Sequence, residues 1–548
     1  MHDFTTILAL LFAAVLVEPL AKRLDVPLPI AQVICGLLLS ALPIFHGLTF
    51  APELVLVLFV PPLLFWTSTT TSMRDVRRNA RSILLLAVVL VLVTTVVVAV
   101  VAHTVAPALP WASAFVLGAM VAPTDADVTT AIARRLGVPT RLVTVLEGET
   151  LLNDTAAFVT YRLAVSAAMV GTFSLVEAAT GFVLMAAGGA AVGLAIGWLV
   201  ARLSRWITDA TAASTLSLLT PFAAYLIAEH IGASGVLAVV VAGFCFSRFV
   251  PRTVSAGTRV QGRGVWETLI FCVGGLVFTL IGIQLGELAP TLWRGKDPGL
   301  LRAAVLVSLT IVGVRLCTVF LGNYLPRLGG KRRSAGEQRP SWRSLVVLSW
   351  AGLRGGDTLV MVLGVPLLTA SGAPFAGRET LTAIAIGVVG MTLIVMGLTL
   401  RPVIRLLAIP HDDSVEDEMR RGRREAARVA TERLDVLAED ERLAPEAVMY
   451  LRAVIAMRTG IRAGRIDEPA PDEGGTDIHA VREIEREVRE AAGAAVVGLR
   501  DANVIGQEAM RRLQRDLDLD KIRDAGLDEA QGVVRSARAL ATSRRAAS

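Results

Sequence analysis

Charged side chains are scarce in this 548-residue chain: Asp, Glu, Lys and Arg make up 19% of it, whereas 54% is hydrophobic and the mean hydropathy is +0.61. Soluble globular domains carry about 25% charged residues, so most of this chain is unsuited to water. The four cysteines all lie in apolar stretches without a CxxC spacing, so we expect neither a disulfide framework nor a zinc site. Hydrolase, kinase and dinucleotide-binding motifs are missing from the C-terminal part beyond residue 408, and we expect neither an enzyme nor a bound cofactor.

Long apolar runs are what the chain has instead. A helix needs roughly 20 apolar residues to cross the ~30 Å hydrocarbon layer of a membrane. Thirteen stretches of suitable length predict an all-α polytopic membrane domain over residues 1–408, in contact with membrane lipid. They span residues 4–21, 28–46, 52–70, 82–106, 111–133, 142–168, 174–200, 211–230, 234–250, 264–292, 301–325, 342–369 and 378–408.

The loops between these segments differ in their basic residues. Counted together with the adjoining ends of the segments, loops after odd-numbered segments hold 23 Lys and Arg residues, and loops after even-numbered segments hold 4. Because Lys and Arg near helix ends stay on the cytoplasmic side, we predict an N-terminus outside and a C-terminus in the cytoplasm.

The sequence changes to dense charge near its residue 410, which predicts a cytoplasmic helical tail over residues 409–548. Residues 411–548 hold 24 basic and 29 acidic side chains, so the basic excess belongs to the loops of the membrane part. A nucleic-acid partner therefore gains no support. The tail is either a solvated extension that stabilises the protein or a regulatory module, and its sequence indicates no effector.

Two membrane segments contain helix-breaking residues next to charge. In segment 111–133, Pro123 removes a backbone donor directly before the polar run that includes Asp125. In segment 342–369, three glycines surround Arg354 and weaken the helix there. Both segments take fifth place in a run of six, with opposite directions, which predicts inverted repeats whose two broken helices cross near the middle of the membrane.

Segment 142–168 carries carboxylates that a membrane tolerates chiefly beside a partner, a cavity or an ion path. Residues four apart share one helical face. Glu149 and Asn153 therefore lie on one face, whereas Thr150 and Asp154 lie on the neighbouring face. We expect Thr150 and Asp154 to point into one cavity and Glu149 and Asn153 to address another partner.

Arg315 is the only charge between residues 308 and 325. Stranding one member of a buried ion pair costs about 3–5 kcal/mol, so a buried arginine in this segment needs an acidic partner. Glu149 is our candidate for that partner.

Four motifs in this order resemble the signatures of a known family: APTDA at 122–126, LEGETLLND at 146–154, RLCTVFLGNYLPR at 315–327 and SWAGLRGG at 349–356. They are similar to the monovalent cation:proton antiporter superfamily, sodium/proton exchanger branch, in its bacterial form. The resemblance covers residues 4–408, and the tail is similar to that of bacterial members too.

The resemblance implies that Asp154 binds a cation and a proton alternately, with Asn153 before it. It implies that Thr124, Asp125 and Thr150 complete the ion site, with Asp154, Thr124 and Thr150 as the Na⁺ ligands. Antiporters with this Asn-Asp pair are typically electroneutral.

The resemblance further implies that Glu149 and Arg315 form a structural ion pair and that Arg354 is the basic residue of the second broken helix. It implies a homodimer in a bacterial inner membrane that exchanges Na⁺ for protons and serves pH homeostasis, with Li⁺ and K⁺ as open alternatives.

Asp127 and Asp357 depart from the family pattern, because we expect apolar residues at both positions. They either line a surface or pore, or pair with Arg354, or change the choice of cation or the stoichiometry. The last possibility puts electroneutral exchange in doubt.

Other functions fit less well. An intramembrane aspartyl protease would need YD and GxGD motifs, which the chain lacks. A channel would need a continuous pore lined by carbonyls or acids. A proton-coupled carrier of another small ion or solute remains the alternative.

Overall fold

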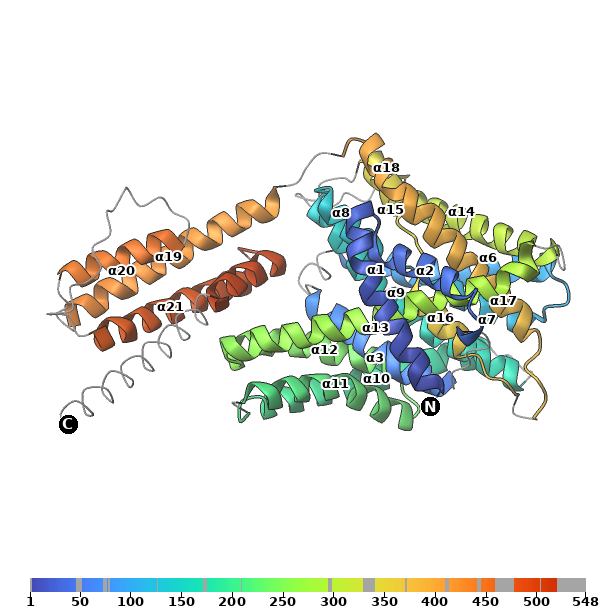
Figure 1. Cartoon of the computed structure of the whole chain (residues 1–548), viewed down its shortest axis with the longest axis horizontal. Helices are drawn as coiled ribbons and strands as arrows, with labels where there is room; N and C mark the ends of the chain where they lie inside the picture. Colours follow the sequence, from blue (N-terminus) through green and yellow to red (C-terminus); the bar gives the residue numbers. More distant parts are fainter. Residues whose placement is uncertain are drawn as a thin grey trace, which may run out of the picture. The chain divides into compact units, whose positions relative to one another are not determined.

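The computed structural model describes residues 2–45, 52–71, 76, 79–125, 127–170, 175–207, 209–293, 298–328, 341–369, 372–409, 413–440, 445–458, 478–502 and 504–519. The regular elements in these ranges are helices (Figure 1), and β pairing within them is limited to one isolated bridge between Leu368 and Pro374. The chain forms two compact units, of which the first is Met1–Ile207, Ala212–Thr253 and Gly264–Asp412. The second is Thr208–Thr211, Val254–Arg263 and Asp413–Ser548.

Most helices belong to the first unit. They are α1 (His2–Leu24), α2 (Leu28–Leu39), α3 (Pro52–Thr70), α5 (Ala80–Leu84), α6 (Leu90–Val105), α7 (Trp111–Val121), α8 (Asp127–Arg135), α9 (Thr140–Val170), α10 (Leu175–Leu203), α11 (Ala210–His230), α12 (Gly235–Thr253), α13 (Ala256–Trp293), α14 (Pro298–Leu328), α15 (Trp342–Trp350), α16 (Gly356–Leu363), α17 (Arg378–Met391) and α18 (Gly397–Leu406). Short π-helical stretches at Leu85–Val89 and Thr392–Met396 join α5 to α6 and α17 to α18, and a 3₁₀ turn lies at Pro43–Phe45.

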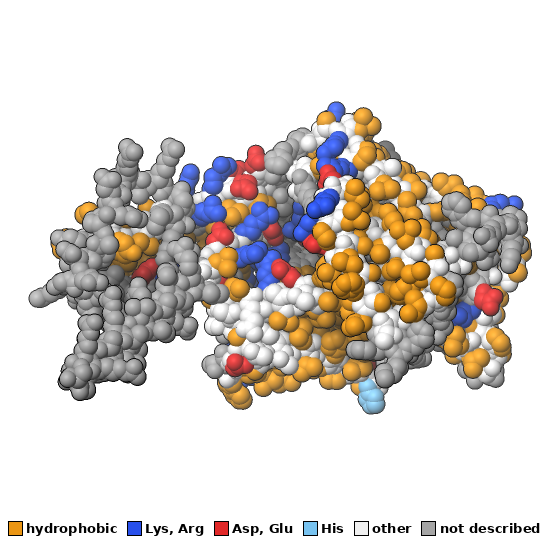
Figure 2. Space-filling view, viewed as in Figure 1, with side chains coloured by type: hydrophobic (Ala, Val, Ile, Leu, Met, Phe, Trp, Pro, Cys, Tyr) orange, Lys and Arg blue, Asp and Glu red, His pale blue; other side chains and the backbone are white. Residues whose placement is uncertain are grey.

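Six described helices are long and apolar enough to cross a membrane. They are Ser82–Val105, Ala179–Leu203, Ala210–His230, Ala256–Leu288, Gly299–Asn323 and Arg378–Leu406, and shorter apolar helices lie at Leu28–Leu39, Leu56–Thr70, Trp111–Val121 and Gly235–Arg248. Hydrophobic side chains also cover much of the visible face of this unit (Figure 2). These helices agree with the predicted multi-pass membrane protein, whereas the bounds of the membrane domain and the count of thirteen crossings stay predictions.

Two groups of helices pack within the first unit. In one group, α7 packs against α6, α9 and α17, and α14 packs against α6 and α17. In the other group, α12 packs against α3 and α10. Residues of α2 and α13 also come close, because a Cβ at Gly36 would overlap the carbonyl of Thr279 and one at Gly282 would overlap the carbonyl of Val33. Small residues are what permit such close approach between membrane helices.

The second unit contains the tail helices α19 (Ser414–Asp440), α20 (Pro445–Arg458) and α21 (Ile478–Asp501), with further helical residues 507–519. Apolar stripes of these helices form one core that includes Leu434, Leu451 and Ile484. The start of α13 belongs to this unit as well, and there Arg259 forms an ion pair with Asp518. The unit begins at Asp413 in the tail, a few residues after the domain boundary expected at 408.

Candidate functional site

Two interrupted helices form the centre of the site. Helix α7 ends at Val121 and α8 begins at Asp127, and likewise α15 ends at Trp350 and α16 begins at Gly356. The two non-helical segments touch, because the backbone N–H of Asp125 donates to the carbonyl of Leu353 at 2.9 Å. Both breaks occur where the proline and the glycines of the sequence predict them.

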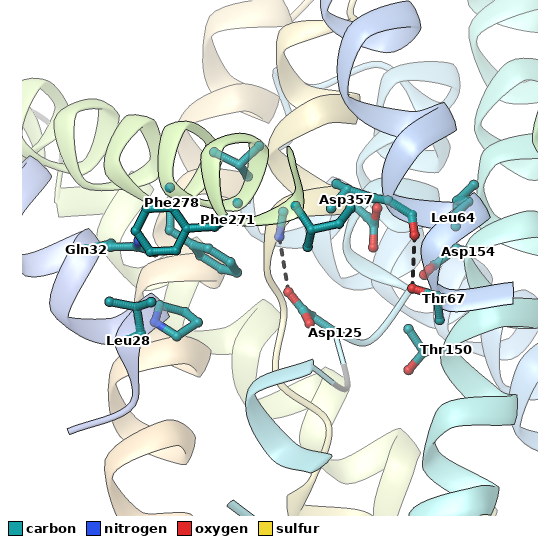
Figure 3. Close-up of a pocket in the computed structure, with 17 residues that line it drawn as sticks. Leu28, Gln32, Leu64, Thr67, Asp125, Thr150, Asp154, Phe271, Phe278 and Asp357 are labelled. Atoms are coloured by element: carbon teal, nitrogen blue, oxygen red, sulfur yellow. Dashed lines mark hydrogen bonds between the residues drawn. The ribbon is translucent and has the colours of Figure 1, made fainter. Parts of the chain in front are cut away.

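Gly355 is what permits this contact. A Cβ at this position would lie 2.7 Å from Cγ of Asp125 and would overlap its carboxylate oxygen. That carboxylate accepts a hydrogen bond from the N–H of Gly356 at 3.4 Å (Figure 3). Asp125 therefore lies at the N-terminus of α16, where a negative charge is favoured by the helix dipole.

Arg354 donates hydrogen bonds to the C-terminal ends of the two interrupted helices. Its Nε donates to the carbonyl of Val121 at 2.8 Å, and its other nitrogens donate to the carbonyls of Ala122 and Gly352. These carbonyls lie at the C-terminal ends of α7 and α15, where helices leave acceptors unpaired and present partial negative charge. The guanidinium is 1% exposed, so backbone acceptors are what stabilise this buried cation.

Glu149 and Arg315 form an ion pair between α9 and α14, as the sequence predicts. Both Nη atoms of Arg315 donate to the carboxylate of Glu149, one of them at 3.0 Å. Arg315 also donates to the carbonyl of Leu348 in the last turn of α15, at 2.9 and 3.1 Å. The two side chains are each 1% exposed, and the pair joins three helices around the breaks.

The two faces of α9 differ as expected. Asn153 donates from Nδ2 to Oγ1 of Thr124 at 2.7 Å, and the Thr124 hydroxyl donates to Glu149 at 3.1 Å. On the neighbouring face, Thr150 donates to the carbonyl of Thr124 at 3.2 Å. Asp154 is on that same face and is 2% exposed.

A cavity of about 190 Å³ opens beside Asp154. Three aspartates line it, namely Asp125 from the first break, Asp154 from α9 and Asp357 from α16, and Figure 3 shows their side chains around it. Thr150 lines the cavity too. No Lys, Arg or His is found among the described residues that line it, so its charged side chains are all acidic. The other residues that line the cavity are Leu28, Pro29, Gln32, Leu63, Leu64, Thr67, Ile270, Phe271, Gly274, Gly275, Val277, Phe278 and Gly356.

The structure thus separates the candidate residues into three places. The cavity brings together the three aspartates and Thr150. The hydroxyl of Thr124 lies instead with Asn153 and the Glu149–Arg315 pair, and Arg354 lies among the carbonyls of the broken helices. The side chain of Asp127 lies outside the described residues. Over the described part of the chain, no group of three or more His, Cys, Asp or Glu side chains could together hold a metal ion.

Two polar residues that line the cavity were not predicted from the sequence. They are Gln32 in α2 and Thr67 in α3, which are polar residues in apolar helices (Figure 3). A lone polar residue in an apolar segment is itself a signal, and Gln32 could have been found this way.

Comparisons with known proteins agree with this architecture. The family described as "Sodium/hydrogen exchanger, transmembrane" matches residues 7–406. The chain is 34% identical to an uncharacterized Na(+)/H(+) exchanger of Mycobacterium tuberculosis, over 94% of this chain and 95% of that relative. It is 31% identical to a sodium, potassium, lithium and rubidium/H(+) antiporter of Bacillus subtilis, over 68% of this chain and 56% of that relative.

A solved structure shares the fold. The sodium proton antiporter MjNhaP1 from Methanocaldococcus jannaschii superposes with a TM-score of 0.55 at 17% identity, covering 75% of this chain and 99% of that chain. The all-α membrane fold expected from the sequence is therefore confirmed. On the family match and the similarity over nearly its whole length, the chain belongs to the transmembrane sodium/hydrogen exchanger family.

Proposed function

We propose that this protein is a secondary antiporter that exchanges a monovalent cation, Na⁺ first, for protons by alternating access. The observation that supports this most strongly is the position of Asp154 and Thr150. Both line one cavity beside the contact between two broken helices, as Asp125 does. Family membership supports the same conclusion.

Exchange follows from competition for one carboxylate. A small hard cation prefers oxygen ligands, and the Asp154 carboxylate and the Thr150 hydroxyl supply them. The carbonyl of Thr124 accepts the Thr150 proton, so the hydroxyl oxygen can face a cation. The family resemblance implies the Thr124 hydroxyl as a further ligand, but its hydrogen bonds to Asn153 and Glu149 favour a supporting role.

Coupling of cation transport to proton transport requires that the binding site does not switch between the two sides of the membrane while it is empty. An ionised carboxylate without a partner is costly at membrane depth, so Asp154 moves between the two sides only with a cation or a proton bound. Each tenfold gradient is worth about 1.4 kcal/mol, so a proton gradient can drive the cation outward. The Asn153–Asp154 pair favours one cation for one proton.

The cavity walls suggest which parts move. One wall comes from α9 and the two breaks, and the other from α2, α3 and α13. We infer that the group around α7, α9 and α14 moves against the wall of α2, α3 and α13, opening the cavity to each side in turn.

The remaining features of the proposal follow from the family and from the charge of the loops. We infer a homodimer in a bacterial inner membrane, with the N-terminus outside, the C-terminus in the cytoplasm and no cofactor. Transport of this kind contributes to pH homeostasis. Large apolar side chains on α1 and α10, such as Phe12 and Trp198, are exposed and suit contact with lipid or a second subunit.

The test is dissipation of a pH gradient in everted membrane vesicles after addition of Na⁺, Li⁺ or K⁺ separately. We expect a cation-dependent response for the wild type and none for Asp154→Asn, which keeps the shape of the side chain but cannot ionise. A wild type that responds to none of the three cations would instead favour the carrier of another ion or solute.

A further inference from the structure

Asp357 lies where the family pattern leads us to expect an apolar residue, yet the structure brings it to the ion cavity. It occupies the first turn of α16 and lines the same cavity as Asp154 and Thr150 (Figure 3). The N-terminus of a helix favours a carboxylate. The Asp357 side chain is half-buried and lines the cavity.

Arg354 is not the partner of this carboxylate, although it is only three residues away. Its hydrogen bonds go to the carbonyls of Val121, Ala122 and Gly352. The charged groups that face Asp357 are acidic: Asp125 acts on it through space, and Asp154 lies close enough for a side-chain hydrogen bond. No salt bridge to Asp357 is found within the described residues.

A carboxylate in a membrane protein persists chiefly where it has a partner, a cavity or an ion path. Here two carboxyl groups from different helices lie within reach of each other, beside the hydroxyls of Thr150 and Thr67. Carboxylate and hydroxyl oxygens are the ligands that a small hard cation prefers, and the number of charged ligands sets its affinity. A bound cation would supply the positive charge that the lining lacks.

Resting on the proposed function, we propose that Asp357 is a second carboxylate ligand of the transported cation, which binds between Asp154 on α9 and Asp357 on α16. The cation then contacts both α9 and α16, the second half of the second broken helix. Asp357 is consequently a determinant of cation affinity and of the preference among Na⁺ and Li⁺.

The experiment measures the apparent KM for Na⁺ and for Li⁺ in proteoliposomes that contain the purified full chain. Asp357→Val removes both side-chain oxygens, and Asp357→Asn keeps one. We expect Asp357→Val to raise the KM for Na⁺ at least about tenfold, with an intermediate rise for Asp357→Asn and an altered ratio of the Na⁺ and Li⁺ values. Thr358→Val is the matched control, because Thr358 is buried beside Asp357 and its hydroxyl makes no hydrogen bond.

The outcomes separate this inference from the proposed function. An Asp357→Val protein with the wild-type KM for both ions overturns the inference, while inactivity of Asp154→Asn in the same preparation leaves the proposed function intact. If Asp154→Asn still exchanges, the proposed function itself fails. Should Asp357→Val be folded but inactive, calorimetric titration with NaCl decides: weakened binding supports the inference and a wild-type Kd contradicts it. Should it not fold, the KM of Asp357→Asn decides in the same way.

Discussion

Replacing Arg315 by methionine should destabilise the membrane domain by stranding a charge. Its guanidinium donates to both carboxylate oxygens of Glu149 and to the carbonyl of Leu348, and both members of the ion pair are 1% exposed. Removing one partner of a buried pair costs about 3–5 kcal/mol, mainly because the other charge is left uncompensated. We therefore expect Arg315→Met to lose stability of this order.

A double-mutant cycle tests that reasoning. In Arg315→Met with Glu149→Gln no charge is stranded, and the glutamine oxygen can still accept from Thr124. The double variant should recover about 1–3 kcal/mol relative to the sum of the single changes. Unfolding of the purified protein in mixed micelles with increasing SDS, followed by tryptophan fluorescence, measures the free energies. Additive losses would refute the claim that Glu149 depends on Arg315.

Two further predictions concern the contact between the two broken helices and the tail. Gly355→Ala should abolish transport in the vesicle assay, since the added Cβ would overlap the carboxylate of Asp125. The control Gly313→Ala in α14 should transport like the wild type, because nothing lies within 4 Å of its added carbon. In the tail, Asp518→Asn should accelerate limited proteolysis of the second unit, because its largely buried pair with an arginine of α13 is worth about 1.5–3 kcal/mol. Asp516→Asn should have little effect, since that aspartate forms an exposed pair.

The sequence predicts those parts of the site that depend on local chemistry. Pro123 and the glycines near Arg354 locate both helix breaks, because backbone donors and conformational freedom act within a few residues. The two faces of α9 follow from helical periodicity alone. The pairing of Glu149 with Arg315 follows from the scarcity of charge, since few partners are available at membrane depth.

Contacts between distant segments could not be predicted in the same way. Two acceptors of Arg354, the carbonyls of Val121 and Ala122, belong to the other broken helix, 233 residues away for Val121, and any backbone offers carbonyls. Thr67 contributes to the cavity only because α3 approaches α9. Helix ends were also less predictable than apolar content: segment 28–46 contains the shorter helix α2, which ends at Leu39, because hydropathy does not define where a helix stops.

A cation and a proton compete for Asp154 in the proposed exchange, and the release of protons on cation binding is the direct test of this competition. Purified protein in weakly buffered solution, at a pH where Asp154 is protonated in part, is mixed with NaCl, and a pH indicator reports the protons set free. We expect that Na⁺ binding releases protons in the wild type, that the apparent Kd for Na⁺ falls as pH rises, and that Asp154→Asn releases none. Binding of Na⁺ to the wild type without release of protons at any pH would show that the two ions do not compete for Asp154.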